Sequence, residues 1–298
     1  MKSTMTEPVT TGLTDPILAA LPRVKGKPLL GNVVLESRLG RGAMSHVFYG
    51  QHLHFEIPVV VKMMRQGEDA DPHAWDRFLR EGSIGSRIRH PNIIRVLEYD
   101  HHDGQAYLVM EFVQGVTLGH CIFRTPLREH RALEIMRPIA EGLSTVWREG
   151  YLHADVKPDN ILVPVEDTHP RLLDLGFARP IDERDPLLQD RMTAGTPYYM
   201  SPEAARGEPC LGIQSDMYSF GSTLYHALTG TVPFEGDSEE EVMRALQDRN
   251  PVPPLARNRD LTEETSNFVM KLLEKKPDNR FSHSEFLLAL RHLTALAG

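Results

Sequence analysis

The chain has 298 residues, of which 41% are hydrophobic, and its 33 basic and 41 acidic residues give a net charge of -8. This length is enough to bury a large core and suits one large domain or two lobes around a cleft. The negative charge repels polyanions and argues against nucleic acid as a partner. No apolar run approaches the roughly 18 residues that cross a bilayer, and the start of the chain lacks the apolar core of a signal peptide. The two cysteines, Cys121 and Cys210, are far apart and are expected to be small packing residues of a reduced compartment. We therefore expect a cytoplasmic protein without a membrane span.

The first part of the chain predicts a small antiparallel sheet with one helix. Residues 1–32 mix Thr, Pro and Gly and predict a flexible leader. Strand-like runs follow at 33–40, 46–53, 57–64, 93–102 and 105–113, and Asp103-Gly104 predicts a hairpin turn between the last two. A helical pattern over 75–88 places Phe78, Glu81, Gly85 and Ile88 on one inward face, where the glutamate needs a partner.

Beyond Gly115 the pattern becomes helical. Amphipathic segments occur at 127–150, 216–230, 239–247, 263–276 and 284–293, and two short strands at 160–165 and 170–175 interrupt them. A sheet-rich lobe followed by a helix-rich lobe leaves a natural cleft between the two.

The segment HADVKPDN, residues 153–160, gathers polar groups directly before a strand. Asp155 and Asn160 can face one point, where the first accepts a proton and the second holds a metal ion. The next strand ends in Asp174-Leu175-Gly176, which supplies a second oxygen ligand. Because Mg²⁺ usually takes one or two protein oxygens together with phosphates and waters, Asn160 and Asp174 predict a site for Mg²⁺ and a nucleotide.

A phosphate-binding loop is indicated upstream. The run from Leu39 to Val47 places small residues between two predicted strands, where backbone N–H groups can lie close to phosphates. Lys62 lies within an apolar strand, where an unpaired ammonium would be costly. Glu81 on the inward helix face can pair with Lys62 while the lysine reaches phosphate oxygens.

Together these residues resemble the bacterial serine/threonine protein kinases of eukaryotic type. The resemblance covers residues 33–293, with a sheet lobe at 33–113, a helical lobe at 114–293 and a short tail at 294–298. It implies an α+β, two-lobed protein kinase fold: an N-terminal antiparallel sheet lobe with one main helix, and a larger, mainly helical C-terminal lobe.

The resemblance also assigns roles. It matches Asp155 to the catalytic aspartate, Lys157 to the lysine of serine/threonine kinases, and Asn160 and Asp174 to the metal ligands. Lys62 and Glu81 match the strand lysine and its helix partner. Residues assigned to the nucleotide are Leu39, Gly40, Gly42, Val47, Val60, Lys62, Met110, Glu111, Val113 and Leu162. The implied cofactors are ATP and Mg²⁺, with Mn²⁺ as the alternative ion.

The run GTPYYMSPE resembles the segment that receives the substrate peptide, with Thr196 near the catalytic aspartate. Ser201-Pro202-Glu203 replaces the usual Ala-Pro-Glu. The resemblance implies that Glu203 pairs with Arg280 and that Asp216 braces the catalytic loop from a buried helix. It gives His153 a supporting role rather than one as an acid or base.

Several positions depart from the common form. Ala154 replaces an arginine that often holds a phosphate on the activation segment, which argues against activation by phosphorylation there. Thr193 is the candidate for self-phosphorylation.

Ser45 stands where a third glycine is frequent, which requires a negative φ. Val60 is larger than the usual alanine over the adenine ring. Gly82 and Gly85 each lower helix propensity by about 1 kcal/mol, so the helix is predicted to be mobile.

The expected function is transfer of the ATP γ-phosphoryl group to serine or threonine hydroxyls of protein substrates in signal transduction. One rival is a small-molecule kinase, against which the peptide-receiving segment argues. A second rival is a pseudokinase that binds partners without chemistry, against which the intact Lys, Asp, Asn and Asp set argues.

Overall fold

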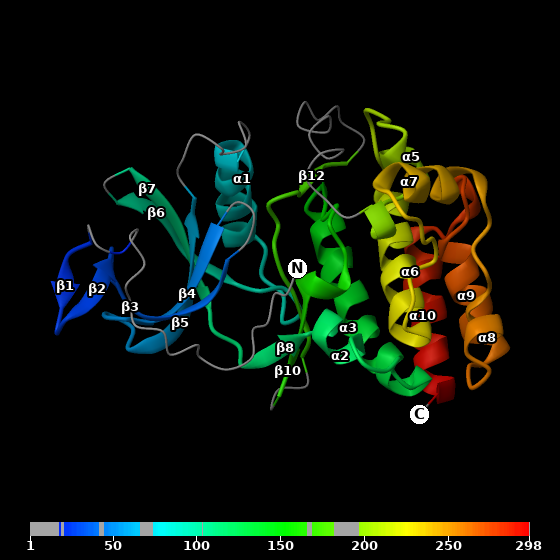
Figure 1. The fold of residues 1–298 in the computed structure, drawn as a ribbon, viewed down its shortest axis with the longest axis horizontal. Helices are drawn as coiled ribbons and strands as arrows, with labels where there is room; N and C mark the ends of the chain where they lie inside the picture. Colours follow the sequence, from blue (N-terminus) through cyan, green and yellow to red (C-terminus); the bar gives the residue numbers. More distant parts are fainter. Residues whose placement is uncertain are drawn as a thin grey trace. The chain divides into compact units, whose positions relative to one another are not determined.

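The structure, a computed structural model, describes residues 18, 21–41, 45–65, 74–102, 104–165, 169–181 and 197–297. The chain divides into two compact units. The first unit comprises Met1–Arg89, Ile94–Val116 and Pro164–Glu166, and the second comprises His90–Ile93, Thr117–Val163 and Asp167–Gly298 (Figure 1).

The first unit contains an antiparallel sheet of seven strands in the order β1-β2-β3-β4-β5-β7-β6 (Figure 1). Its strands are β1 (Arg23–Val24), β2 (Lys27–Leu30), β3 (Val33–Arg41), β4 (Ser45–His52), β5 (Ile57–Met64), β6 (Val96–His102) and β7 (Gln105–Glu111). Helix α1 (Ala74–Arg87) packs against β5 and β6, and the short strand β8 (Gly115–Thr117) follows the sheet in sequence. The antiparallel sheet and its single main helix are as predicted.

Strand β5 shows how alternation builds this unit. Val59, Val61 and Met63 are buried in a core with residues such as Phe48 and Val109. The intervening residues, Val60, Lys62 and Met64, are half-buried on the opposite face, where Met64 packs against Phe78 of α1 and Leu108 of β7. One face of the strand therefore belongs to the core, and the other face is only half-buried.

The predicted flexible leader is wrong for residues 23–30. Strands β1 and β2 pair with each other, and β2 pairs with β3. Leu30 and Leu18 are fully buried in the core of the unit. The turns Lys25-Gly26 and Gly31-Asn32 join these strands, with positive φ at Lys25, Gly26 and Gly31, as hairpin turns require. The remainder of the leader, residues 1–17, 19 and 20, lies outside the described residues.

The predicted stripe of Phe78, Glu81, Gly85 and Ile88 is buried, with Ile88 directly after the end of α1 at Arg87. Gly82 has a packing role as well. A Cβ at this position would lie 2.9 Å from Cγ of Tyr99 and 3.0 Å from Cδ2 of Leu108, so the absence of a side chain lets α1 approach the sheet closely. The mobility of this helix stays a prediction.

The second unit is mainly helical. Its helices are α2 (Leu118–Ile122), α3 (Glu129–Arg148), α5 (Pro202–Ala205), α6 (Ile213–Thr229), α7 (Glu239–Asp248), α8 (Pro254–Arg257), α9 (Glu263–Leu272) and α10 (His283–Ala297). The short 3₁₀ turns of its described residues are η2 (Pro158–Asn160), η4 (Pro197–Tyr199) and η5 (Pro277–Asn279). The short strands are β9 (Tyr151–Leu152), β10 (Ile161–Pro164), β11 (Arg171–Leu172) and β12 (Arg179–Pro180), and β9 pairs with β12 and β10 with β11.

Aromatic side chains fill the centre of this unit. Phe286 of α10 contacts Phe220 of α6, Phe268 of α9 and Trp147 of α3, with ring centroids 5.1, 6.2 and 5.9 Å apart. Helix α6 is buried along almost its whole length and ends at Gly230, whose φ of 74° forms a left-handed cap. These contacts make α6 a fixed support for the loops around it.

Among the described residues, no helix combines the length and the apolar character needed to cross a membrane. Both cysteines are free. Cys121 packs against the core of the second unit as expected, whereas Cys210 is exposed, so its predicted packing role is wrong.

Candidate active site

The sheet of the first unit brings predicted nucleotide residues to one face. Gly40 of β3 lies opposite Val47 of β4, and Val47 lies opposite Lys62 of β5. Val60, two residues before Lys62, lies opposite Met110 of β7. Because directly opposed residues share a face and alternate residues of a strand return to it, these side chains line one surface, and all are half-buried.

Lys62 and Glu81 form the predicted ion pair. The Lys62 Nζ lies 2.7 Å from Oε2 of Glu81, and the side chains are only 15% and 5% exposed. An ammonium in a sheet this poorly solvated needs a carboxylate partner, and α1 supplies it. The helix thereby fixes the lysine on the face that carries Val47, Val60 and Met110.

The other residues predicted to bind the nucleotide are described unit by unit below. Leu39 is half-buried in β3, and Gly42 lies outside the described residues. The Glu111 N–H donates to the Arg95 carbonyl at 3.0 Å, and its Oε1 accepts from the Arg95 N–H at 2.9 Å. Val113 is half-buried just after β7, and Leu162 is buried in β10 of the second unit.

In the second unit, Asp155, Lys157 and Asn160 form one polar cluster. Oδ2 of Asp155 accepts from Lys157 Nζ at 2.8 Å and from Asn160 Nδ2 at 2.8 Å. Asn160 Nδ2 also donates to the Asp155 carbonyl at 2.9 Å. Among the described residues both bonds to the carboxylate fall on Oδ2, which leaves Oδ1 to accept from an incoming hydroxyl.

Strand pairing places Asp174 beside this cluster. Ile161 of β10 lies opposite Leu172 of β11, and the Leu173 N–H donates to the Asn160 carbonyl at 2.8 Å. Asn160 and Asp174 therefore occupy neighbouring positions at the ends of two paired strands. Asp174 has a φ of 60°, and its Oδ1 accepts from the Gly176 N–H at 3.1 Å. This left-handed conformation sets the direction of the carboxylate where the chain turns.

The donor atoms fit a magnesium ion carried by a nucleotide. The Nδ2 of Asn160 is used by Asp155, so its amide oxygen is the atom available to an ion, together with the Asp174 carboxylate. The described residues hold no group of three or more His, Cys, Asp or Glu side chains arranged around a metal. Two hard oxygens suit Mg²⁺, which keeps waters and substrate phosphates in its remaining positions.

Asp216 of α6 holds the loop that carries Asp155. Its Oδ2 accepts from the His153 N–H at 2.8 Å and from Trp147 Nε1 at 2.9 Å, and its Oδ1 accepts from the Ala154 N–H at 2.7 Å. His153 Nε2 bonds to the Leu173 carbonyl at 2.9 Å, which agrees with a supporting role. The bracing predicted for Asp216 is present, and Trp147 is a partner that the sequence did not indicate.

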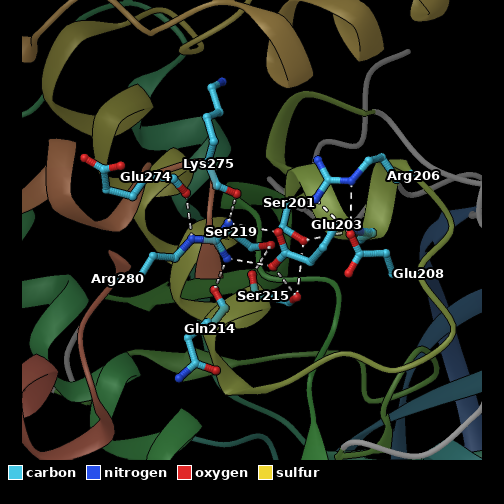
Figure 2. A network of polar contacts seen from close by, with 11 residues as sticks. Ser201, Glu203, Arg206, Glu208, Gln214, Ser215, Ser219, Glu274, Lys275 and Arg280 are labelled. Carbon is cyan, nitrogen blue, oxygen red and sulfur yellow. Dashed lines mark hydrogen bonds and ion pairs between the residues drawn. The ribbon is translucent and has the colours of Figure 1, made fainter. Parts of the chain in front are cut away.

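Glu203 and Arg280 form a buried, bidentate ion pair (Figure 2). Arg280 Nη1 lies 2.6 Å from Oε1 and Nη2 lies 2.9 Å from Oε2, with the two side chains 0% and 2% exposed. Ser215 Oγ donates to Oε1 at 2.6 Å. Burial alone would raise the pKa of Glu203, but the hydrogen bonds and charge of Arg280, together with Ser215, outweigh it and hold the pKa below its usual value.

The chain matches the family model described as protein kinase domain over residues 33–290. The chain belongs to the protein kinase family. Its α+β, two-lobed fold is thereby confirmed, and the family uses ATP and a divalent metal ion.

Curated relatives include serine/threonine-protein kinase PknB of Mycolicibacterium smegmatis, 38% identical over 251 residues, which cover 82% of this chain and 40% of that protein. PknB of Mycobacterium tuberculosis is 36% identical over 249 residues, with 82% and 40% covered. Serine/threonine-protein kinase pkn3 of Myxococcus xanthus is 34% identical over 270 residues, with 87% and 49% covered. The chain therefore spans less than half the length of these relatives.

The structure explains two departures from the common kinase form. Ala154 has a φ of 63°, and Asp216 binds its N–H, so the backbone of the loop is held without help from this side chain. Ser201 caps α5 by accepting from the Ala204 N–H at 3.3 Å and donates to Ser215 at 3.3 Å. Ser201 thereby joins the hydrogen bonds around Glu203, a role that sequence reasoning missed.

Ser45 behaves as the kinase pattern requires, because it begins β4 opposite Met64 without a positive φ. Val60 lies in β5 on the half-buried face as expected. Thr193 and Thr196 lie outside the described residues.

Proposed function

We propose that this kinase domain transfers the γ-phosphoryl group of ATP to serine or threonine hydroxyls of protein substrates. The observation that carries the proposal is the cluster of Asp155, Lys157 and Asn160, with Asp174 at the neighbouring strand end. Phosphoryl transfer needs little covalent work from the protein, and it depends on positioning and on stabilising charge. The names of the relatives support protein serine and threonine as acceptors.

Asp155 is the residue that orients the acceptor hydroxyl and receives its proton. Lys157 and Asn160 both bind Oδ2, which fixes the plane of the carboxylate and directs Oδ1 outward. In this role the Lys157 ammonium also lies close to the transferring phosphoryl group and offsets part of its charge.

Asn160 and Asp174 would hold the metal ion, and Lys62 would bind the phosphates of the nucleotide. When bound, Mg²⁺ neutralises charge on the phosphate oxygens. We favour Mg²⁺ because both donors are oxygens, and Mn²⁺ is the alternative with the same ligand preference. Glu81 binds the Lys62 ammonium on the half-buried face of the sheet, where Val47, Val60 and Met110 would contact the adenine ring.

Regulation by a phosphate on the activation segment is not required in this proposal. Ala154 carries no guanidinium to bind such a phosphate, and Asp216 already holds the loop through the Ala154 N–H. Thr193 remains the proposed site of self-phosphorylation and Thr196 a proposed contact of the catalytic aspartate.

The test is transfer of label from γ-labelled ATP, with Mg²⁺ or Mn²⁺, to a generic acceptor such as myelin basic protein. Asp155→Asn is expected to lower kcat by about 10²–10⁴-fold, the usual contribution of a positioned base, with an unchanged thermal transition. Asp174→Ala should abolish the metal-dependent rate. Asp260→Asn, at an exposed aspartate of the same unit, is the matched control and should behave as wild type.

Label on seryl or threonyl groups of the acceptor supports the proposal. Transfer only to small alcohols would instead favour a small-molecule kinase. Nucleotide binding without any transfer, equal in wild type and Asp155→Asn, would favour a pseudokinase.

A further inference from the structure

Helix α6 supports two loops that are far apart in sequence. Asp216 binds the N–H groups of His153 and Ala154, and Thr223 Oγ1 bonds to the Val156 carbonyl at 3.3 Å. These bonds flank Asp155 on both sides. Ser222 Oγ donates to the Tyr198 carbonyl at 2.8 Å, so the same helix also holds η4, which follows Thr196 in sequence.

One further contact joins α6 to η4, and it is made between two side chains. Tyr199 Oη lies 2.7 Å from Nδ1 of His226, and the two rings stack with centroids 6.1 Å apart and planes inclined by 24°. His226 is one helical turn beyond Ser222 on α6. The proposed chemistry of Asp155 uses neither Tyr199 nor His226, so this pair needs its own explanation.

The surroundings keep both partners of this hydrogen bond uncharged. Burial raises the pKa of Tyr199, and the charge of Asp159 adds to this effect, so the phenol stays protonated at neutral pH. Burial lowers the pKa of His226 against the opposing effect of Asp159, so the imidazole is neutral. We assign the Tyr199 hydroxyl as the donor and His226 Nδ1 as the acceptor, with the ring proton on Nε2.

Tyr199 also lines the hollow beside the catalytic aspartate, which we call the acceptor hollow. Its lining includes Asp155 and Lys157 together with Tyr199, Met200 and Leu211. All of these residues belong to the second unit. The orientation of the Tyr199 ring therefore determines part of the surface that lies next to Asp155.

We propose that the Tyr199–His226 hydrogen bond positions the protein acceptor, because it fixes Tyr199 as a wall of the acceptor hollow. Tyr199 and His226 are positioning residues, and the transfer step itself still belongs to Asp155. The inference rests on the proposed kinase function. It assigns the pair to the binding of the protein substrate and not to the binding of ATP, whose phosphate-binding lysine, Lys62, lies in the first unit.

The test compares KM for myelin basic protein and KM for ATP in Tyr199→Phe and His226→Leu. Tyr199→Phe keeps the ring and removes only the hydroxyl. A hydrogen bond of ordinary net strength predicts that KM for the acceptor rises about threefold to tenfold, while KM for ATP stays within about twofold. The double variant should be no worse than the more affected single variant, because both changes remove the same bond.

Two further variants separate positioning from general stability. In His226→Asn the side-chain amide can replace Nδ1 as the acceptor, so this change should restore most of the acceptor affinity. Thr229→Val removes a hydroxyl of the same helix whose hydrogen bonds, within the part of the chain that the structure describes, go to Tyr225 and Thr231, and it should leave both KM values unchanged.

The proposal is overturned if Tyr199→Phe and His226→Leu leave KM for the acceptor unchanged, or if both KM values rise together. It is also overturned if the effects of the two changes multiply in the double variant. An inactive wild type would contradict the proposed function itself, and an active wild type whose variants show no change in KM would contradict only this inference.

Discussion

Replacing Glu203 by glutamine tests how much the buried ion pair stabilises the helical unit. Arg280 donates five hydrogen bonds, two to the Glu203 carboxylate and three to the carbonyls of Gln214, Glu274 and Lys275. The substitution keeps the shape of the side chain but leaves a guanidinium that is 0% exposed without its counter-charge. The glutamine amide also places an NH₂ group against one of the arginine nitrogens, so one bond is lost.

The expected cost follows from this arrangement. Removing one partner of a buried pair typically destabilises a protein by about 3–5 kcal/mol. The three remaining carbonyl acceptors still satisfy Arg280 in part, so we expect the lower end of this range, about 3 kcal/mol. For a domain of this size that corresponds to a fall in Tm of roughly 6–12 °C.

Figure 2 shows a matched control in the same part of the fold. Glu208 pairs with Arg206 at 2.8 Å, but these side chains are 45% and 42% exposed. A surface pair contributes about 0–1 kcal/mol, so Glu208→Gln should shift Tm by no more than roughly 4 °C. Calorimetry on both variants compares the loss of Tm for a buried and an exposed glutamate–arginine pair, with the same Glu→Gln change in each.

The pH dependence gives an independent readout of the same pair. The pKa of Glu203 is lowered in the folded state from its usual value of 4.5, so its contribution is fully present above that value and is lost as pH falls through the folded pKa. Below about pH 4.5 the wild type should therefore lose Tm more steeply than Glu203→Gln. Equal Tm values for wild type and Glu203→Gln at pH 7, or parallel pH profiles, would refute the reasoning.

Two other predictions concern backbone geometry. Ala154→Gly should raise the free energy of unfolding, measured with urea, by about 1 kcal/mol. The φ of 63° at Ala154 is strained for a residue with a Cβ and is not strained for glycine. A lower free energy of unfolding would contradict this account. Gly82→Ala should destabilise by about 1–2 kcal/mol despite its better helix propensity, because the new Cβ would lie 2.9 Å from Tyr99 Cγ. Tyr99→Ala in the same chain removes Cγ but leaves its Cβ and the Leu108 Cδ2 each 3.0 Å from the new Cβ, so it should recover only part of that loss. A stable Gly82→Ala single variant would show that α1 has room to move.

The residues that the sequence predicted well are close together in the chain or lie on regular elements. Asp155, Lys157 and Asn160 fall within six positions, and the structure joins them by hydrogen bonds. The pairing of Lys62 with Glu81 was predictable because a charged residue occurs in an apolar strand and another on the inward face of a helix. Alternation of apolar residues predicted most of the remaining strands, and helical periodicity predicted most of the remaining helices.

The predictions failed or were missing where an element is too short to show a pattern, or where a residue's role depends on a partner far away in the sequence. Strands β1 and β2 contain two and four residues, too few to show alternation, and their turns alone indicated them. Ser201 and Ser215 are ordinary polar residues in sequence, and only the buried Glu203 gives their hydroxyls a role. His226 lies 27 residues from Tyr199 on a helix whose neighbours are unknown until it is packed.

Buried polar groups explain why α6 can set the geometry of two loops. Asp216, Ser222 and Thr223 are each 0% exposed, and all three form hydrogen bonds with the backbone of those loops. Leaving a buried polar group without a partner costs about 1–3 kcal/mol, which is more than the net gain from making the bond. A loop that shifted away from α6 would therefore incur several such costs at once. The apolar core fixes the position of the helix. The cost of leaving these buried groups unbonded, rather than the strength of any single bond, keeps η4 and the loop that carries Asp155 in one arrangement.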